Sequence, residues 1–319
     1  MTESGVTKHS GGAVVVLGAT ASGKSAVAMA AARQVPGTEI VAVDAMQVYR
    51  GMDIGTAKPT AVDRAAVPHH GLDLVEPDRS FTVAEFVATY EAARAGIAER
   101  DGRPLLVAGT GLYLTAVLDG LDLPGQYPDA RAAVDQESDT AALYARLTAL
   151  DPIAAGRIEP GNRRRLVRAL EVTIGSGRLF SSFGPGVAAF PPTNAVLVGI
   201  RWSRHDLGLR IDSRVDAMID AGLLDEVARL RATGLSRTAA QALGYKELLE
   251  HLHGHVTLDD AIAATKLHTR QFAVRQERWF RRDPRVRWID VTDDPVAEAA
   301  PAVVAALAGR RPGGGGGNW

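Results

Sequence analysis

Cysteine is absent from this chain of 319 residues, and several kinds of chemistry are excluded with it. Without thiols the protein can form no disulfide, no iron–sulfur cluster and no thiolate zinc site, and it has no cysteine nucleophile. A chain that does without disulfides fits a reducing compartment.

Long apolar runs and an excess of charge of one sign are also missing. Residues 1–12 lack the apolar core of a signal peptide, and the run from Ala13 to Leu17 is far shorter than the ~20 residues that span a bilayer. The 36 Lys and Arg nearly balance the 37 Asp and Glu, so only a local basic patch could attract nucleic acid. We expect a cytoplasmic monomer with no membrane segment.

The chain does contain a clear alternation of short apolar segments with Ala-rich or amphipathic ones. This alternation predicts an α/β fold, a parallel sheet with helices on both faces. We expect strands at 13–17, 39–43, 104–108 and 195–200, and helices at 25–34, 82–100, 112–119, 206–233 and 259–281.

The pattern changes near Leu123-Pro124-Gly125. Residues 130–174 are almost wholly helical in pattern and rich in Arg and Ala, and 175–192 have the Gly, Ser and Pro of a loop. The length of the chain suits roughly two domains. We therefore expect a core of residues 11–122 and 194–310, a helical insertion of 123–193, and a flexible Gly-rich tail of 311–319.

A phosphate-binding loop follows the first expected strand. Residues 18–25 fit G-x-x-x-x-G-K-[ST] without deviation and stand between a strand and a helix, the context that makes this motif credible. The backbone N–H groups and the helix N-terminus would hold a phosphate, Lys24 would add a full charge, and the Ser25 hydroxyl would bind Mg²⁺. The pattern indicates a polyphosphate ligand, of which ATP is the commonest, and a P-loop NTPase-like sheet. The residues of the loop are Gly18, Ala19, Thr20, Ala21, Ser22, Gly23, Lys24 and Ser25.

Asp44 directly follows the second expected strand. In open α/β sheets the carboxyl ends of the strands border the ligand crevice, so Asp44 should lie near the phosphate loop. Position alone leaves three roles open, which are a cap or surface carboxylate, a group that helps to hold Mg²⁺, and a general base.

Longer segments resemble one family, the tRNA dimethylallyltransferases (tRNA isopentenyltransferases). The resemblance covers about residues 13–290 in order. Besides the phosphate loop it rests on residues 44–59 (DAMQVYRGMDIGTAKP), 68–73 (PHHGLD), 108–113 (AGTGLY), 165–172 (RLVRALEV), 210–216 (RIDSRVD), 242–247 (ALGYKE) and 269–282 (TRQFAVRQERWFRR).

This resemblance implies a specific reaction. Members of the family transfer the dimethylallyl group of dimethylallyl diphosphate to N6 of the adenosine just 3′ of the anticodon, in tRNAs that read codons beginning with U. The phosphate loop would then bind the donor's diphosphate. Asp44 matches the family's base, Arg214 its diphosphate-binding arginine, and Thr20 and Thr110 its threonines that contact the donor or place the acceptor.

The resemblance also implies residues that contact tRNA. The family's tRNA-contacting loop matches Asp44, Ala45, Met46 and Gln47. In the insertion, Arg164, Arg165 and Arg168 can share a helix face, and the family match makes them phosphate-binding candidates, with Arg131 as a weaker one. Partners would be the tRNA anticodon stem-loop and dimethylallyl diphosphate.

Two other clusters remain open. Arginines of the segment 270–282 alternate with Phe272, Trp279 and Phe280, and these aromatic rings could stack on bases or pack in the core. His251, His253 and His255 have a spacing that resembles a metal site, but we expect a solvated loop because no nearby carboxylate completes it.

Two alternative functions are compatible with the residues alone. One is an ATP-dependent P-loop small-molecule kinase, which would need an arginine-bearing lid for which the sequence has no clear motif. The other is a nucleotide-gated RNA-binding module without catalysis, which would leave Asp44 and Arg214 without a role.

Overall fold

The computed structural model describes residues 12–184 and 186–309. The expectations for residues 1–11 and for the tail of 311–319 lie outside these described residues. The described chain forms two compact units, residues 12–118 with 192–309, and residues 119–191.

The first unit is built on a six-stranded parallel sheet, which confirms the predicted fold class. The strand order is β3-β2-β4-β1-β5-β6, with Val14 of β1 opposite Leu105 of β4 on one side and opposite Val196 of β5 on the other. The strands are β1 (Val14–Gly18), β2 (Thr38–Val43), β3 (His69–His70), β4 (Arg103–Ala108), β5 (Val196–Arg201) and β6 (Val286–Asp290).

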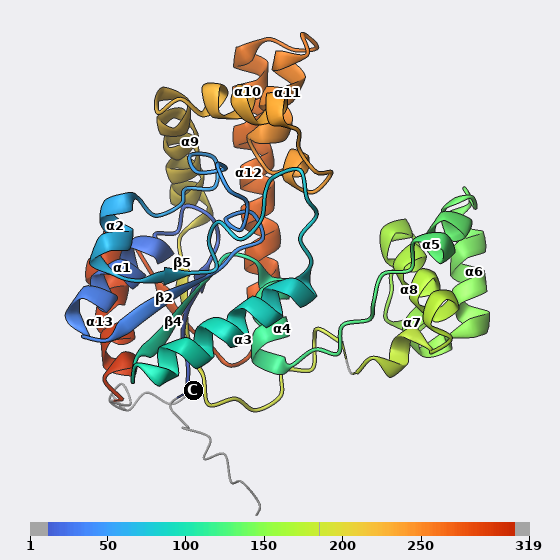
Figure 1. Ribbon diagram of the computed structural model, residues 1–319, viewed down its shortest axis with the longest axis horizontal. Helices are drawn as coiled ribbons and strands as arrows, with labels where there is room; N and C mark the ends of the chain where they lie inside the picture. The colour runs from blue at the N-terminus through green and yellow to red at the C-terminus, as the bar shows by residue number, and fades with distance from the viewer. Residues whose placement is uncertain (1–11, 185, 310–319) are drawn as a thin grey trace, which may run out of the picture. The chain divides into compact units, whose positions relative to one another are not determined.

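Strand β1 is buried along its whole length because both faces of the sheet are covered. Successive side chains point to opposite faces, so Val15 and Leu17 join one hydrophobic cluster while Val14 and Val16 join another. The second cluster is covered by α1 (Lys24–Gln34) and α13 (Pro295–Leu307), which lie side by side (Figure 1). The helices that contribute to the first are α3 (Val83–Glu99), α4 (Gly111–Asp119), α10 (Leu223–Thr233), α11 (Tyr245–Leu252) and α12 (Leu258–Phe280).

The segment after β5 differs from its prediction. A single helix over 206–233 was expected, but α9 (Arg204–Asp220) and α10 are separate helices. Gly222 lies between them with a φ of +95°, a left-handed conformation that ends a helix and that favours glycine. The remaining elements of this unit are the short helix α2 (Ala61–Ala66) and a 3₁₀ turn, Ala239–Gln241.

The second unit is entirely helical and has a hydrophobic core of its own, centred on Leu143, Leu147, Leu166 and Leu170. The side chains of Asp139, Asp151 and Asn162 each accept a backbone N–H at a helix start, and these N-caps divide the helical segment. Its elements are α5 (Pro128–Asp135), α6 (Thr140–Leu150), α7 (Pro152–Gly156), α8 (Arg163–Ser176) and a 3₁₀ turn, Phe180–Ser182.

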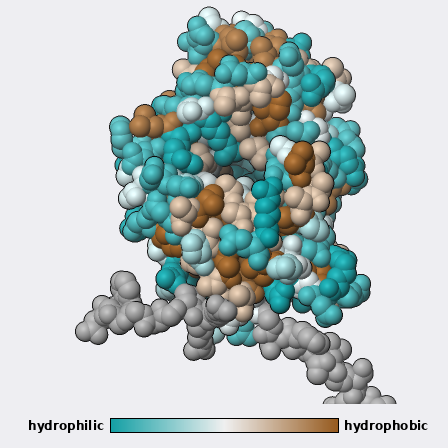
Figure 2. All heavy atoms as spheres, turned by 90° about the vertical axis from the view of Figure 1, so that its left-hand side faces the viewer, coloured by the Kyte–Doolittle hydropathy of each residue, from teal (hydrophilic) through white to brown (hydrophobic). Residues whose placement is uncertain are grey.

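Among the described residues, no helix combines the length and the apolar character that crossing a membrane requires. Figure 2 shows one face of the molecule, on which hydrophobic residues are scattered among hydrophilic ones.

Candidate active site

The phosphate loop connects β1 to α1 in a conformation that few residues can adopt. Ala21 and Gly23 both have left-handed backbones, with φ of +61° and +92°. At Gly23 a Cβ would also lie 2.6 Å from Cγ of Pro295 at the start of α13. The glycine is therefore required by its φ and by the close approach of α13.

Two side chains hold the loop's carbonyl groups. Arg210 of α9 donates from Nε to the Ala21 oxygen at 3.0 Å, and the Trp202 indole donates to the Ser22 oxygen at 3.0 Å. A trans peptide points its N–H away from its carbonyl, so the second bond turns the Gly23 N–H to the opposite side. This N–H and the first N–H groups of α1 can then face an anion, as at other helix N-termini.

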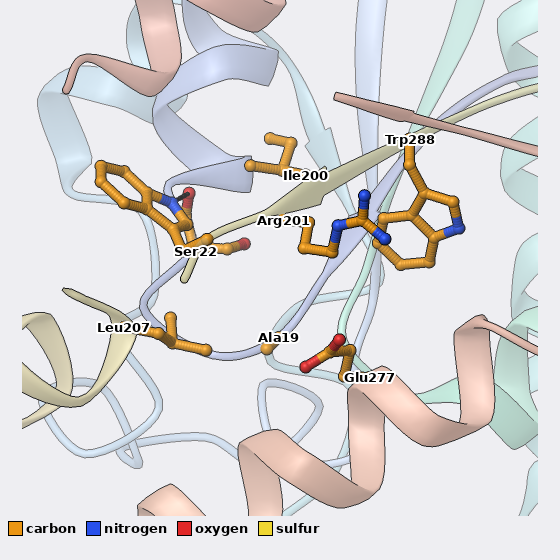
Figure 3. Close-up of a pocket in the computed structure, with 8 residues that line it drawn as sticks. Ala19, Ser22, Ile200, Arg201, Leu207, Glu277 and Trp288 are labelled. Atoms are coloured by element: carbon orange, nitrogen blue, oxygen red, sulfur yellow. Dashed lines mark hydrogen bonds between the residues drawn. The ribbon is translucent and has the colours of Figure 1, made fainter. Parts of the chain in front are cut away.

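A small cavity borders the loop at Ala19 and Ser22. Figure 3 shows that Arg201 of β5 extends toward Trp288 here, while Glu277 enters from α12. The Ser22 hydroxyl is buried and has no hydrogen-bond partner among the described residues. A space this small, whose walls are partly polar, suits a water molecule rather than a substrate.

Lys24 is held where its charge is poorly solvated. Its Nζ donates to the Ala19 carbonyl oxygen at 3.3 Å. Burial and, next, the Arg214 charge lower the pKa of Lys24 to about 8, while the Asp44 charge opposes both. At neutral pH the ammonium is still protonated, and a bound anion would stabilise that charge.

Asp44 and Thr110 lie at the ends of the neighbouring strands β2 and β4. Asp44 Oδ1 accepts the backbone N–H groups of Met46 at 2.8 Å and of Gln47 at 3.3 Å, and the Thr110 hydroxyl accepts the Ala45 N–H at 3.0 Å. No donor of the described residues occupies Asp44 Oδ2. The carboxylate is therefore fixed through one oxygen and can accept a proton at the other.

Arg214, on α9, adds a second cation to this crevice. Burial lowers the pKa of Arg214, and the Asp44 charge raises it, but a guanidinium stays protonated in either case. Lys24 therefore lies close enough to Asp44 and Arg214 for their charges to affect its pKa, and Arg214 lies similarly close to Asp44. The structure brings together the phosphate loop and the residues that the resemblance assigned to catalysis.

The loop that follows Asp44 is fixed by a buried carboxylate. Glu226 of α10 accepts the backbone N–H groups of Asp53, Ile54 and Gly55 at 2.9–3.2 Å. The ordered loop in turn accepts two hydrogen bonds from the Gln47 amide nitrogen, at the carbonyl oxygens of residues 56 and 57. The Gln47 amide oxygen therefore remains as the acceptor it can offer a ligand. Met46 packs against the core.

The chain is similar to known proteins over most of its length. The profile of a family described as IPP transferase matches residues 47–283, and one described as isopentenyl transferase matches residues 12–66. The chain belongs to the IPP transferase family.

Its relatives match over nearly their whole length. A tRNA dimethylallyltransferase of Roseiflexus is 46% identical over 91% of this chain and 97% of its own. One from Kineococcus radiotolerans is 47% identical over 89% and 92%. A crystal structure of a tRNA isopentenylpyrophosphate transferase from Bacillus halodurans superposes with a TM-score of 0.68, at 37% identity over 93% and 97%.

In this member of the IPP transferase family, the arginines of the basic helix α8 fall into two groups, those without and those with a partner among the described residues. Arg164 and Arg165 are exposed, and no hydrogen bond or ion pair within residues 12–184 and 186–309 occupies either guanidinium. Both lie in the first turn of α8, where the helix dipole disfavours cations. This placement of two cations lowers helix stability.

Three other arginines of the insertion, Arg131, Arg163 and Arg168, hold the unit together. Arg168 donates to the buried Glu171 and to the carbonyl oxygens of Pro124 and Gly125, and Arg131 pairs with Glu171 at 3.3 Å. Arg163 donates to three carbonyl oxygens of residues 135–138. These guanidinium groups have partners already, unlike those of Arg164 and Arg165.

The histidine cluster differs from its expectation in one respect. The sequence led us to expect no carboxylate nearby, but Glu250 lies with His253 and His255, and one ligand atom from each falls within 4.8 Å of the others. The Glu250 carboxylate lies 2.8 Å from Nδ1 of His255. His251 is turned to the Val256 carbonyl instead.

Three residues of the site were not found from the sequence. Arg210 and Glu226 each form hydrogen bonds to backbone groups that are distant in the sequence. Gln276 of α12 does the same, with bonds to Thr20 and Gly109. Gln276 stands in the segment read as arginines and aromatics. Trp279 of that segment packs against the core, beneath the Arg282 guanidinium at 4.3 Å.

Proposed function

We propose that this protein transfers the dimethylallyl group of dimethylallyl diphosphate to N6 of the adenosine 3′ of the anticodon, in tRNAs that read codons beginning with U. The observation that carries the proposal is the convergence of Lys24, Asp44 and Arg214 beside the phosphate loop. The relatives named tRNA dimethylallyltransferase support it, because they match over almost the whole chain.

The chemistry of the transfer suits these residues. The N6 amine is a weak nucleophile because its lone pair is delocalised into the purine ring. Asp44 Oδ2 would take the N6 proton as the nitrogen forms its bond to the allylic carbon and the bond from that carbon to the diphosphate oxygen breaks. Lys24, Arg214 and the loop N–H groups would stabilise the charge that develops on the diphosphate.

One further side chain of the site, that of Ser25, is suited to bind a divalent cation. The Ser25 hydroxyl is exposed at the N-terminal turn of α1, and no hydrogen bond of the described chain occupies it. A hydroxyl oxygen is a ligand of the hard kind that Mg²⁺ takes while it keeps several waters. When bound there beside the diphosphate, Mg²⁺ would neutralise part of the leaving group's charge.

For tRNA we propose two contacts. Gln47, with its amide oxygen free, would accept a hydrogen bond from the edge of the extruded base, whose unstacking costs a few kcal/mol. Arg164 and Arg165 would bind phosphates, a contact that positions RNA without reading its sequence. Thr110 and Thr20 would help to place acceptor and donor.

The test is direct. The protein is incubated with Mg²⁺, dimethylallyl diphosphate and unmodified tRNA, and digested tRNA is analysed by mass spectrometry for N6-isopentenyladenosine. We expect product with this donor and none with ATP in its place. Asp44→Asn should bind tRNA normally and lose about 10²- to 10⁴-fold in rate. Absence of product with the wild type would refute the proposal, and phosphoryl transfer from ATP would favour the kinase.

A further inference from the structure

Gln276 joins two loops that lie far apart in the sequence. Its Oε1 accepts the backbone N–H of Thr20 at 2.8 Å, and its Nε2 donates to the carbonyl oxygen of Gly109 at 2.7 Å. Thr20 follows β1 and Gly109 follows β4, two strands that are neighbours in the sheet. One side chain from α12 thus connects the phosphate loop to the turn after β4.

The bond to Gly109 is made beside the reacting groups. A Cβ built on Gly109 would lie 3.0 Å from Asp44 Oδ2, 3.4 Å from Lys24 Cε and 3.7 Å from Gln276 Nε2. The turn at Gly109 also carries Thr110, whose hydroxyl accepts the N–H of Ala45, the residue after Asp44. A shift of this turn would therefore move Asp44 relative to the phosphate loop.

The amide is suited to this place because it is both donor and acceptor. Gln276 is 7% exposed, so a side chain that served only one of the two backbone groups would leave the other unpaired in a buried position, which is costly. A carboxylate could accept from Thr20 but could not donate to Gly109. The orientation of the amide follows from its partners, an N–H on one side and a carbonyl on the other.

We propose that Gln276 is a positioning residue for the transfer reaction, and that it sets the distance between the phosphate loop and the strand ends that carry Asp44 and Thr110. The inference rests on the proposed function for its kinetic readout. The residue acts through the two backbone groups, so its loss should reduce turnover and leave the affinity for tRNA unchanged. Misplacement of reacting groups by about 1 Å can cost about 100-fold in rate.

A charged replacement separates positioning from a general effect on folding. In Gln276→Glu the introduced carboxyl, when protonated, can both accept and donate as the amide does, but it loses the donor when it ionises. The charges around the Gly109 contact are those of Lys24 and Asp44, with Arg214 acting on Lys24 and Glu277 next in the chain. These are common to the wild type, so the ratio of the two kcat values at each pH isolates the introduced group.

The experiment compares Gln276→Glu, Gln276→Ala and the control Gln271→Glu, an exposed glutamine of the same helix. We expect Gln276→Ala to lose about 10- to 100-fold in kcat, with a tRNA KM within about twofold of the wild type. The ratio of kcat for Gln276→Glu to kcat for the wild type should fall at least about tenfold between about pH 5.5 and about pH 8. Gln271→Glu should give a flat ratio near one.

A flat ratio for Gln276→Glu, or wild-type turnover by Gln276→Ala, would overturn the inference. So would a loss of kcat that only follows the folded fraction measured by circular dichroism. Binding of inorganic diphosphate, measured by calorimetry, gives an independent result, and we expect it to weaken about tenfold in Gln276→Ala. If the wild type forms no prenylated product, the proposed function fails, while the diphosphate titration still tests the positioning role.

Discussion

Gly109 and Asp44 approach each other so closely that a side chain at Gly109 would press on the Asp44 carboxylate. A Cβ on Gly109 would lie 3.0 Å from Asp44 Oδ2 and 3.4 Å from Lys24 Cε. The 3.4 Å contact is close to ordinary van der Waals distance, but the 3.0 Å contact requires the Asp44 oxygen to give way by a few tenths of an ångström. Because Asp44 Oδ1 is already bonded to the Met46 and Gln47 N–H groups, a displaced carboxylate would strain the bonds that fix it.

Replacement of Gly109 by alanine should therefore damage catalysis more than stability. We expect Gly109→Ala to lower kcat about 10-fold or more, since small displacements of a base are costly, while the midpoint of urea unfolding changes little. Steady-state kinetics and unfolding curves check both. The control is Gly156→Ala, where the added methyl meets no atom within 4 Å. Unchanged kcat in Gly109→Ala would mean that Asp44 tolerates the shift.

The lowered pKa of Lys24 predicts how donor use depends on pH. Burial lowers this pKa to about 8, so in the free protein Lys24 is charged below about pH 8 and loses its proton above it. The kcat/KM for dimethylallyl diphosphate, which reports the free enzyme, should therefore fall as pH rises through 8. Lys24→Arg keeps its positive charge at this pH and should not show the fall in kcat/KM. If kcat/KM still falls in this variant, a group other than Lys24 causes the fall.

The same shift predicts that Lys24 destabilises the fold. A lysine with a lowered folded-state pKa is protonated more readily in the unfolded chain, so its charge costs stability in full below about pH 8, and the cost fades as pH rises toward 10.5. We expect Lys24→Met to raise the free energy of unfolding by about 1–2 kcal/mol at neutral pH while it abolishes turnover. Urea unfolding of both proteins at neutral pH and above pH 10 measures this gain in stability. If the gain is as large at the higher pH, the charge of Lys24 is not its cause.

The sequence was sufficient where a local pattern specifies the structure. The phosphate loop at residues 18–25 and the strand that precedes Asp44 were predicted from motif and alternation, because glycine positions and buried β-branched runs act over a few residues. The segment of α9 and α10 was predicted as one helix because the amphipathic period continues through it. Gly222 marks the break between the two helices.

Contacts between distant segments could not be predicted in this way. Gln276 bonds to Thr20, which lies 256 positions away in the sequence, and to Gly109, which lies 167 positions away. Glu226 bonds to the loop at Asp53–Gly55, which is 171–173 positions away. In each case a side chain meets backbone groups, which carry no sequence signature. The resemblance placed Arg168 at tRNA, but only the packing around Glu171 distinguishes it from Arg164 and Arg165.

This distinction gives the last prediction. If Arg164 and Arg165 bind phosphates, each contact releases counterions, and the slope of log affinity against log salt falls by about 0.7–0.9 for each contact removed. The double variant Arg164→Gln/Arg165→Gln should therefore bind tRNA more weakly, with a slope smaller by about 1–2. It should also be slightly more stable, by a few tenths of a kcal/mol, because cations are removed from the first turn of α8.

Filter binding of tRNA at several salt concentrations measures the slope, and thermal unfolding measures the stability. The matched control is Arg146→Gln, which removes an exposed arginine of α6 in the same unit and should leave the slope unchanged. Arg168→Gln should behave differently from both, because it deprives the buried Glu171 of a partner, and loss of stability should dominate. An equal loss of slope in the Arg146 variant would mean that general charge, rather than the α8 pair, attracts the RNA.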